Sequence, residues 1–153
     1  MLETPHVAVG AAIATKIANP LLSLPLAFAS HFVLEKVPHW NPHLNSEINQ
    51  YGKVTDKSTK IVIVDATLAL LTGFYVAINY SQNPHHALII LTASFLSVVP
   101  DVIEAPYLFL NVKSKFIQRW MLFQKSLQEN AAIVPGLITQ VIVFLAAFWW
   151  IAS

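Results

Sequence analysis

Long, predominantly apolar segments separated by short polar ones dominate the pattern along this chain. Three of these segments are close to the length of about 20 residues that a helix needs to cross a membrane. We therefore predict membrane helices at about Thr59–Tyr80, Ala87–Leu110 and Ala131–Ile151. Pro100 and Pro106 should interrupt the second of them, because each proline removes a backbone donor from the helix.

The N-terminal part of the chain contains two shorter apolar segments, separated by an Asn19-Pro20 break. Asn19 can cap a helix and Pro20 can begin one. The segments Val7–Ile17 and Pro20–Lys36 would each form a helix of roughly 20–25 Å, which is short for a membrane span. They form either one kinked span or a hairpin of two short helices. We prefer the hairpin, because it returns His6 to the side where the other polar groups lie.

Two further segments complete the predicted fold. Trp40–Ser58 is polar and rich in turn-forming residues, so we expect a loop. Asn111–Asn130 has apolar and polar residues at helical spacing, which predicts an amphipathic helix lying at the membrane interface. The predicted fold is all-α: one integral membrane domain, 1–153, with an N-terminal hairpin of short helices, three further membrane helices and one interfacial amphipathic helix.

Composition supports this interpretation. Hydrophobic residues make up 56% of the chain and charged residues only 11%, whereas soluble domains contain about 25% charged residues. The formal net charge of +1 produces no strong global field, so nucleic acid is not expected as a partner. The chain has no cysteine, which excludes disulfides and thiolate metal ligands.

Basic residues predict the orientation in the membrane. They gather in the two long loops, at Lys36, Lys53, Lys57, Lys60, Lys113, Lys115, Arg119 and Lys125. The short turn Ser81–His86, on the opposite side, has no Lys or Arg. By the positive-inside rule the two long loops face the cytoplasm, and the C-terminus faces outwards.

Five ionisable side chains interrupt the apolar segments: His31, Glu35, Asp65, Asp101 and Glu104. Such groups are expensive within a membrane and usually mark a functional site. His31 and Glu35 share a helix face, because they are four residues apart. We counted the depth of each residue from the cytoplasmic end of its predicted helix. By this count His31 lies within roughly 7–14 Å of the cytoplasmic surface, and so do the acids Asp65, Asp101 and Glu104. We therefore expect them to meet.

A metal ion would satisfy this cluster. Only Lys36 and Lys60 are plausible nearby cations, so the acids have too few internal partners. Histidine with carboxylates suits zinc, manganese or iron. His6, and His39 just beyond Pro38, are further candidate ligands. The alternative is structural, with ion pairs or hydrogen bonds that tie the helices together.

Several short motifs resemble a known family. Thr4-Pro5-His6 before a Gly/Ala-rich helix, Ser30-His31 with Leu34-Glu35 and Pro38-His39, and the Pro100-Asp101 step are similar to the pattern of small bacterial inner-membrane proteins described as metal-dependent hydrolases. This resemblance implies site roles for His6, His31, Glu35, His39 and Asp101.

The sequence also departs from that family. The family's His-rich stretch has no counterpart, since Phe123–Gln128 lacks a histidine, and Glu35 stands where Asp is expected. These departures leave the implied metal site in place and put the catalysis in question.

The first functional hypothesis is a membrane-embedded metal-dependent hydrolase in the bacterial inner membrane. It would act on an ester or phosphoester, either a small molecule or lipid-derived, at the cytoplasmic leaflet. The expected cofactor is a divalent metal, zinc or manganese. The expected ligands are His6, His31, Asp65, Asp101 and His39, with Glu35 or Glu104 as the general base.

Two alternatives involve no catalysis. A small ion or proton carrier could use Asp65, Asp101 and Glu104 as a relay. A scaffold could use the same buried polar groups only to hold its helices together.

Overall fold

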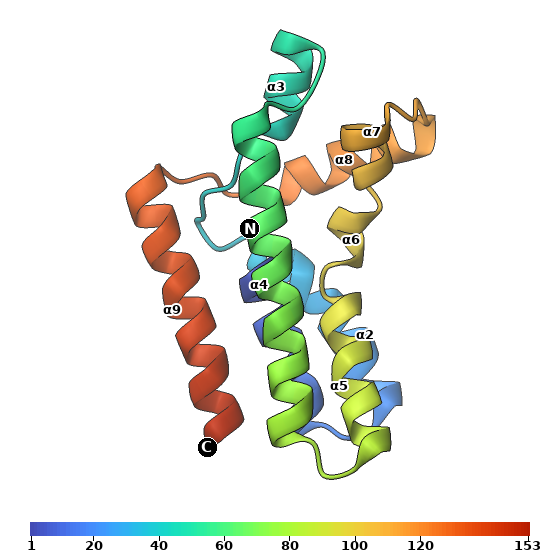
Figure 1. The fold of residues 1–153 in the computed structure, drawn as a ribbon, viewed down its shortest axis with the longest axis vertical. Helices are drawn as coiled ribbons and strands as arrows, with labels where there is room; N and C mark the ends of the chain where they lie inside the picture. Colours follow the sequence, from blue (N-terminus) through green and yellow to red (C-terminus); the bar gives the residue numbers. More distant parts are fainter.

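The computed structural model describes all 153 residues, and 77% of them are helical, with no strands. This confirms the all-α prediction. The nine helices are α1 (Glu3–Lys16), α2 (Pro20–Leu34), α3 (Leu44–Tyr51), α4 (Asp56–Tyr80), α5 (Pro84–Leu96), α6 (Val99–Val102), α7 (Ala105–Leu110), α8 (Lys115–Leu127) and α9 (Ile133–Ala152). Figure 1 shows α4, α5 and α9 running along the long axis, with α8 lying crosswise to them in the upper right of the view.

Two helices, α4 and α9, are long and apolar enough to cross a membrane. The pair formed by α5 and Val99–Leu110 counts as a third if it is one span, bent by 53°. Two or three candidate spans are fewer than the predicted fold contains, because that fold had a membrane hairpin as well as three further membrane helices. The hairpin helices are the reason, because α1 and α2 have only 14 and 15 residues.

The N-terminal hairpin itself is present. Asn19 caps α2 by accepting a hydrogen bond from the backbone N–H of Leu21. The two helices pack against each other, and the chain returns so that the backbone nitrogen of Met1 bonds to Glu35. His6 is therefore at the same end of the hairpin as His31, as the hairpin interpretation required.

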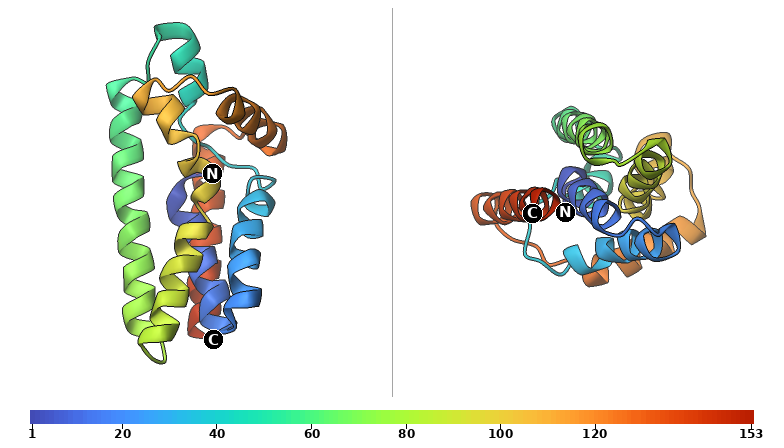
Figure 2. Two further views of the ribbon diagram at one scale, coloured as in Figure 1. Left: turned by 90° about the vertical axis from the view of Figure 1, so that its right-hand side faces the viewer. Right: turned by 90° about the horizontal axis from the view of Figure 1, so that it is seen from below.

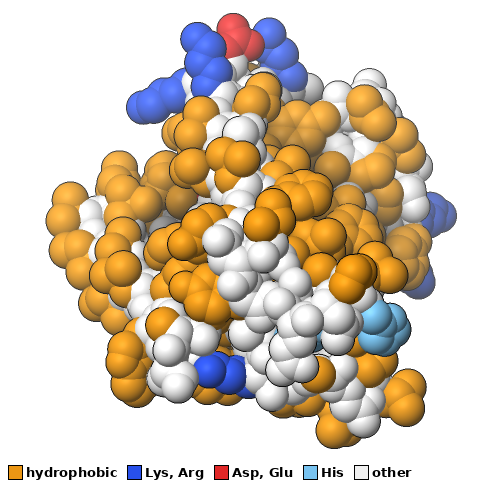
Figure 3. Space-filling model, turned by 60° about the horizontal axis from the view of Figure 1, so that its bottom comes forward, with side chains coloured by type: hydrophobic (Ala, Val, Ile, Leu, Met, Phe, Trp, Pro, Cys, Tyr) orange, Lys and Arg blue, Asp and Glu red, His pale blue; other side chains and the backbone are white.

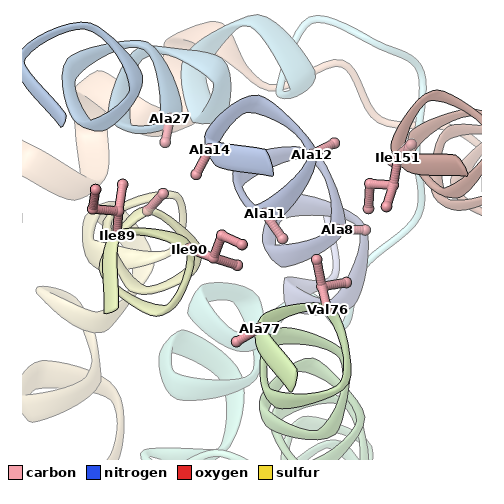
Figure 4. Packing of buried hydrophobic residues seen from close by; sticks show 12 residues of the cluster. Ala8, Ala11, Ala12, Ala14, Ala27, Val76, Ala77, Ile89, Ile90 and Ile151 are labelled. Carbon is pink, nitrogen blue, oxygen red and sulfur yellow. The ribbon is translucent and has the colours of Figure 1, made fainter. Parts of the chain in front are cut away.

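Helix α1 lies at the centre of the molecule and packs against α2, α4, α5 and α9 (Figure 2, right). Its small residues permit this, because they let neighbouring backbones approach closely. The buried cluster joins Ala8, Ala11, Ala12 and Ala14 to Ala27, Val76, Ala77, Ile89, Ile90, Ala93, Ala147 and Ile151 (Figure 4). Gly10 is a point of close approach between α1 and α5, since a Cβ there would lie 2.8 Å from the carbonyl oxygen of Ala93.

The outer faces of the long helices are apolar. Exposed large side chains include Ile63, Leu68, Leu71 and Ile78 of α4 and Val134, Ile138, Ile142 and Leu145 of α9. Hydrophobic side chains cover most of the surface seen in Figure 3. This surface is compatible with an integral membrane protein.

The prolines act as predicted. Pro100 and Pro106 lie in the first turns of α6 and α7, and together with the breaks before them they divide the predicted helix Ala87–Leu110 into three.

The predicted loop Trp40–Ser58 is partly wrong, because it contains α3. A side chain of that segment, Glu47, holds α3 against the start of α4 through Thr55 and Ser58.

The predicted amphipathic helix forms as α8. It turns Ile117, Met121 and Gln124 inwards and leaves Phe116 and Leu122 exposed.

Candidate metal centre

Three of the predicted ligands come together in one group. His6 of α1, His31 of α2 and Asp101 of α6 each offer one ligand atom, and these atoms lie within 4.8 Å of one another. Both histidines are fully buried, and Asp101 is partly buried. The two helices of the N-terminal hairpin and the distant helix α6 therefore bring two imidazoles and a carboxylate to one point.

His6 enters this group from the second turn of α1. Its ring stacks on that of His31, with the ring centroids 4.2 Å apart. Its Nε2 lies 3.3 Å from Oε1 of Glu35, while its buried Nδ1 has no hydrogen-bond partner. A carboxylate on one ring nitrogen holds the ring orientation and leaves the lone pair of the other nitrogen free.

His31 is held from two sides. Its Nδ1 donates to the backbone carbonyl of Ser97 at 2.9 Å, and its Nε2 lies 2.8 Å from Oε1 of Gln124. The same Nε2 is 3.7 Å from Oδ1 of Asp101. Helices α2, α5, α6 and α8 thus meet at this one ring.

Gln124 is a site residue that the sequence interpretation missed. Its amide nitrogen is 3.1 Å from the carbonyl oxygen of Pro100, 3.2 Å from Oδ1 of Asp101 and 2.7 Å from Oε1 of Glu104. The available signal was its position on the inward face of an amphipathic helix, in register with Ile117 and Met121. A polar side chain at an otherwise apolar inward position needs buried partners.

Glu35 and Glu104, the predicted general bases, differ in their surroundings. Glu35 is almost fully buried, and its Oε1 contacts both the backbone nitrogen of Met1 and His6. Glu104 is more open, and Gln124 is the hydrogen-bond partner of its Oε1. Glu35 is thus placed to hold the ring of His6, whereas Glu104 keeps a carboxylate oxygen available to a bound molecule.

Asp65 lies at the same end of the molecule but outside the three-residue group. Its Oδ1 accepts hydrogen bonds from Thr4 Oγ1 at 2.7 Å and from the Thr4 backbone N–H at 3.2 Å, and its Oδ2 accepts one from the Glu3 N–H. The carboxylate therefore caps the N-terminus of α1, where unpaired N–H groups and the helix dipole favour a negative charge.

His39 also lies outside the group. Its backbone pairs with Glu129 and Ala131, which ties the loop after α2 to the loop before α9. Its Nε2 is 3.6 Å from Oε2 of Glu35 and has no hydrogen-bond partner. Burial lowers the pKa of His39, which favours the neutral form of the ring.

A cavity of about 650 Å³ adjoins the group, between α4 and the α5–α7 segment. Asp101 belongs both to the ligand group and to the cavity wall. The other carboxylates of the wall are Glu3, Glu35, Asp65 and Glu104. The sequence interpretation missed Glu3, because a single acid in the first turn of a helix is an ordinary feature.

Comparison of the chain with protein-family models, curated proteins and solved structures gives no match. The resemblance noted in the sequence therefore rests on its short motifs alone.

Proposed function

We propose that this protein is a membrane-embedded metal-dependent hydrolase that acts on an ester or phosphoester. The observation that carries the proposal is the buried group of His6, His31 and Asp101 at the wall of a large cavity. Two imidazoles and a carboxylate are a common ligand set for catalytic zinc, with a further position left for water or substrate.

The residues present fit a divalent metal such as zinc or manganese. Nδ1 of His6 is a buried nitrogen with no other partner, and its lone pair needs either a hydrogen-bond donor or a metal. Glu35 on His6 and the Ser97 carbonyl on His31 are the outer partners that orient ligating imidazoles. Binding through Nε2 of His31 would require the Gln124 amide to turn away from that nitrogen.

A divalent metal in this group would supply Lewis-acid chemistry and activate water near neutral pH. Glu104, at the cavity wall beside Asp101, is the better-placed general base, because its carboxylate is the less enclosed of the two candidates. Glu35 would act through His6 by holding its ring. The apolar remainder of the cavity would exclude bulk water and strengthen these electrostatic contacts.

The proposed location is the cytoplasmic leaflet of a bacterial inner membrane. The support is the set of two or three candidate spans, together with the basic residues of the loops at the site end of the molecule.

Metal content tests the proposal directly. We expect stoichiometric zinc or manganese in protein purified without chelator, and loss of that metal in His31→Ala and Asp101→Asn. His85→Ala is the matched control, because this exposed histidine lies at the start of α5, at the end of that helix away from the site, and should leave the content unchanged. A wild-type protein that takes up no metal, even after loading, would rule out the hydrolase.

Activity is the second test. Purified protein should hydrolyse chromogenic carboxylic esters or phosphodiesters in detergent, and Asp101→Asn and Glu104→Gln should both abolish the reaction. Only Asp101→Asn should also remove the metal. This separation assigns ligation to Asp101 and proton transfer to Glu104.

A non-catalytic scaffold is the second candidate, and one observation favours it. Both ring nitrogens of His31 already have oxygen partners, so the helices are joined without a metal. In a scaffold, Asp101→Asn would lower stability and no variant would change the metal content. The ion-relay alternative is less supported, because hydrogen bonds to α1 engage both carboxylate oxygens of Asp65.

A further inference from the structure

The cavity beside the metal centre has two chemically different ends. Its polar end carries the carboxylates near Asp101, and its apolar end lies between α4 and α5, where Leu70, Phe74, Leu91 and Phe95 line it. Phe74 is nine residues beyond Asp65 on one helix, so the groove extends about 13 Å along α4. A head group and one extended alkyl chain match this shape.

The apolar end reaches the outer surface. Phe74 and Phe95 line the groove and are also about half exposed, at 52% and 56%. Both belong to segments that are candidate membrane spans. A chain lying in the groove could therefore enter sideways from the hydrocarbon layer. The volume of about 650 Å³ falls within the about 300–1,000 Å³ of small-ligand sites.

The polar end is strongly acidic. Five carboxylates line the cavity, against one lysine, Lys125, one histidine, His43, and the backbone nitrogen of Met1. Two of the five are balanced locally: Asp65 by the start of α1, and Glu35 by the backbone nitrogen of Met1. Asp101 would be balanced by a metal.

Glu3 and Glu104 form no ion pair. Oε2 of Glu3 is buried and has no hydrogen-bond partner, and Oε1 of Glu104 has only the neutral amide of Gln124. A phosphate placed here would face several like charges in a poorly solvated site, whereas an ammonium group would relieve them.

We infer that this groove binds a single-chain amphiphile with a positively charged amine head. The inference rests on the proposed function, because it names such amphiphiles as the substrate class of the hydrolase. Hydrolysis of an ester in such a molecule consumes one water and releases an acid and an alcohol, so the site needs no co-reactant.

The test is photolabelling of the C-terminally tagged protein in nanodiscs of neutral lipid. The probes are a long-chain alkylamine, a fatty acid and an alkyl phosphate of equal chain length, each with a diazirine near the chain end. Chelator-treated and zinc-loaded samples are labelled in parallel, and the adducts are mapped by peptide mass spectrometry.

We expect the amine to label the facing segments around Phe74 and Phe95 about tenfold more than the phosphate, which corresponds to about 1.4 kcal/mol. The preference should hold in chelator-treated protein, since Glu3 and Glu104 are not ligands of the proposed metal group. Glu3→Gln combined with Glu104→Gln should remove most of the preference without removing labelling.

A matched pair of variants tests the place of binding. Ala66→Trp fills the groove wall, whereas Leu68→Trp adds the same ring to an exposed position of α4 that does not line the groove. Only Ala66→Trp should abolish labelling. If Ala66→Trp fails to fold, competition of the amine probe by unlabelled alkylamine gives the same answer.

The outcomes separate this inference from the proposed function. Equal labelling by all three probes, or preference for the phosphate, overturns the amine-binding groove even if the protein holds metal and hydrolyses esters. Selective amine labelling of a protein that takes up no metal leaves the groove in place and overturns the hydrolase.

Discussion

His6 and His31 stack face to face at the centre of the site, with their rings 20° from parallel and their centroids 4.2 Å apart. Two protonated imidazoles at this spacing would repel each other by about 4 kcal/mol at an effective dielectric constant of about 20. At least one ring is therefore neutral and has a nitrogen lone pair. Nδ1 of His6 has no hydrogen-bond partner, so we identify His6 as the neutral ring.

His6→Phe should separate the packing of this ring from its chemistry. Phenylalanine keeps an aromatic ring on His31 but offers no nitrogen, so bound metal should be lost. Glu35 keeps its contact with Met1 and loses one hydrogen bond, which should cost about 1–3 kcal/mol. Elemental analysis and a thermal melting curve measure the two effects. Full metal content in His6→Phe would remove His6 from the ligand set.

Gly10→Ala should destabilise the protein, because its Cβ would lie 2.8 Å from both the Ala93 carbonyl oxygen and the Ser97 side chain. Helix α1 would have to shift away from α5, at a cost of about 1–3 kcal/mol. Gly73→Ala is the matched control, since its Cβ would meet Ser94 at an ordinary 3.4 Å. In denaturation experiments, the free energy of unfolding of Gly10→Ala should be well below that of Gly73→Ala. Equal stabilities would mean that α1 is not packed this tightly.

Glu47 should make the stability of the α3–α4 junction depend on acid pH. Slight burial raises the pKa of Glu47, but hydrogen bonds from Ser58 and Thr55 outweigh it and hold the pKa below its ordinary value. A carboxylate with a lowered folded pKa contributes stability above its unfolded pKa of about 4.3, and this is lost as the pH falls through the folded value.

Glu47→Gln should remove that contribution. Hydrogen exchange of the first turn of α4 at pH values from neutral to acid would measure it. In the wild type, protection should decrease as the pH falls, after correction for the intrinsic exchange rate. In Glu47→Gln it should be lower at neutral pH and nearly independent of pH. The same slope in both proteins would assign the effect to another group.

Membrane orientation can be tested cleanly because the chain has no cysteine. Lys53→Cys and His85→Cys place single thiols at exposed positions near opposite ends of α4. If the site end faces the cytoplasm, a membrane-impermeant maleimide should label only His85→Cys in intact cells and both variants after lysis. Labelling of Lys53→Cys alone in intact cells would reverse the proposed orientation.

Sequence reasoning predicted the features that depend on local chemistry. The Asn19-Pro20 break carries its own cap and helix start, so the hairpin could be predicted. Pro100 and Pro106 likewise marked the interruption of the later apolar segment. Helix α3 was missed because Leu44–Tyr51 is too polar to stand out from a loop, although it is amphipathic.

The partners of each side chain could not be predicted in the same way. Helical rise gives the depth of a residue but not the helix that it faces, so the hydrogen bonds of Asp65 to the start of α1 could not be predicted. Gln124 was missed for a related reason. An amide on an amphipathic helix is usually solvated, and only packing shows that this one faces His31 and two carboxylates.

Gln124→Leu gives the sharpest separation between a metal centre and a scaffold. Leucine has a similar size but leaves the Pro100 carbonyl without its Gln124 bond and removes the oxygen that faces His31. In the metal centre, Nε2 of His31 becomes free for ligation, so bound metal should be retained at equal or higher affinity and should raise the melting temperature. In a scaffold the variant should lose about 1–3 kcal/mol per unsatisfied group, and added zinc should not restore it. Melting curves with zinc and with chelator measure the difference. A variant that is destabilised to the same extent in both conditions would contradict the metal centre.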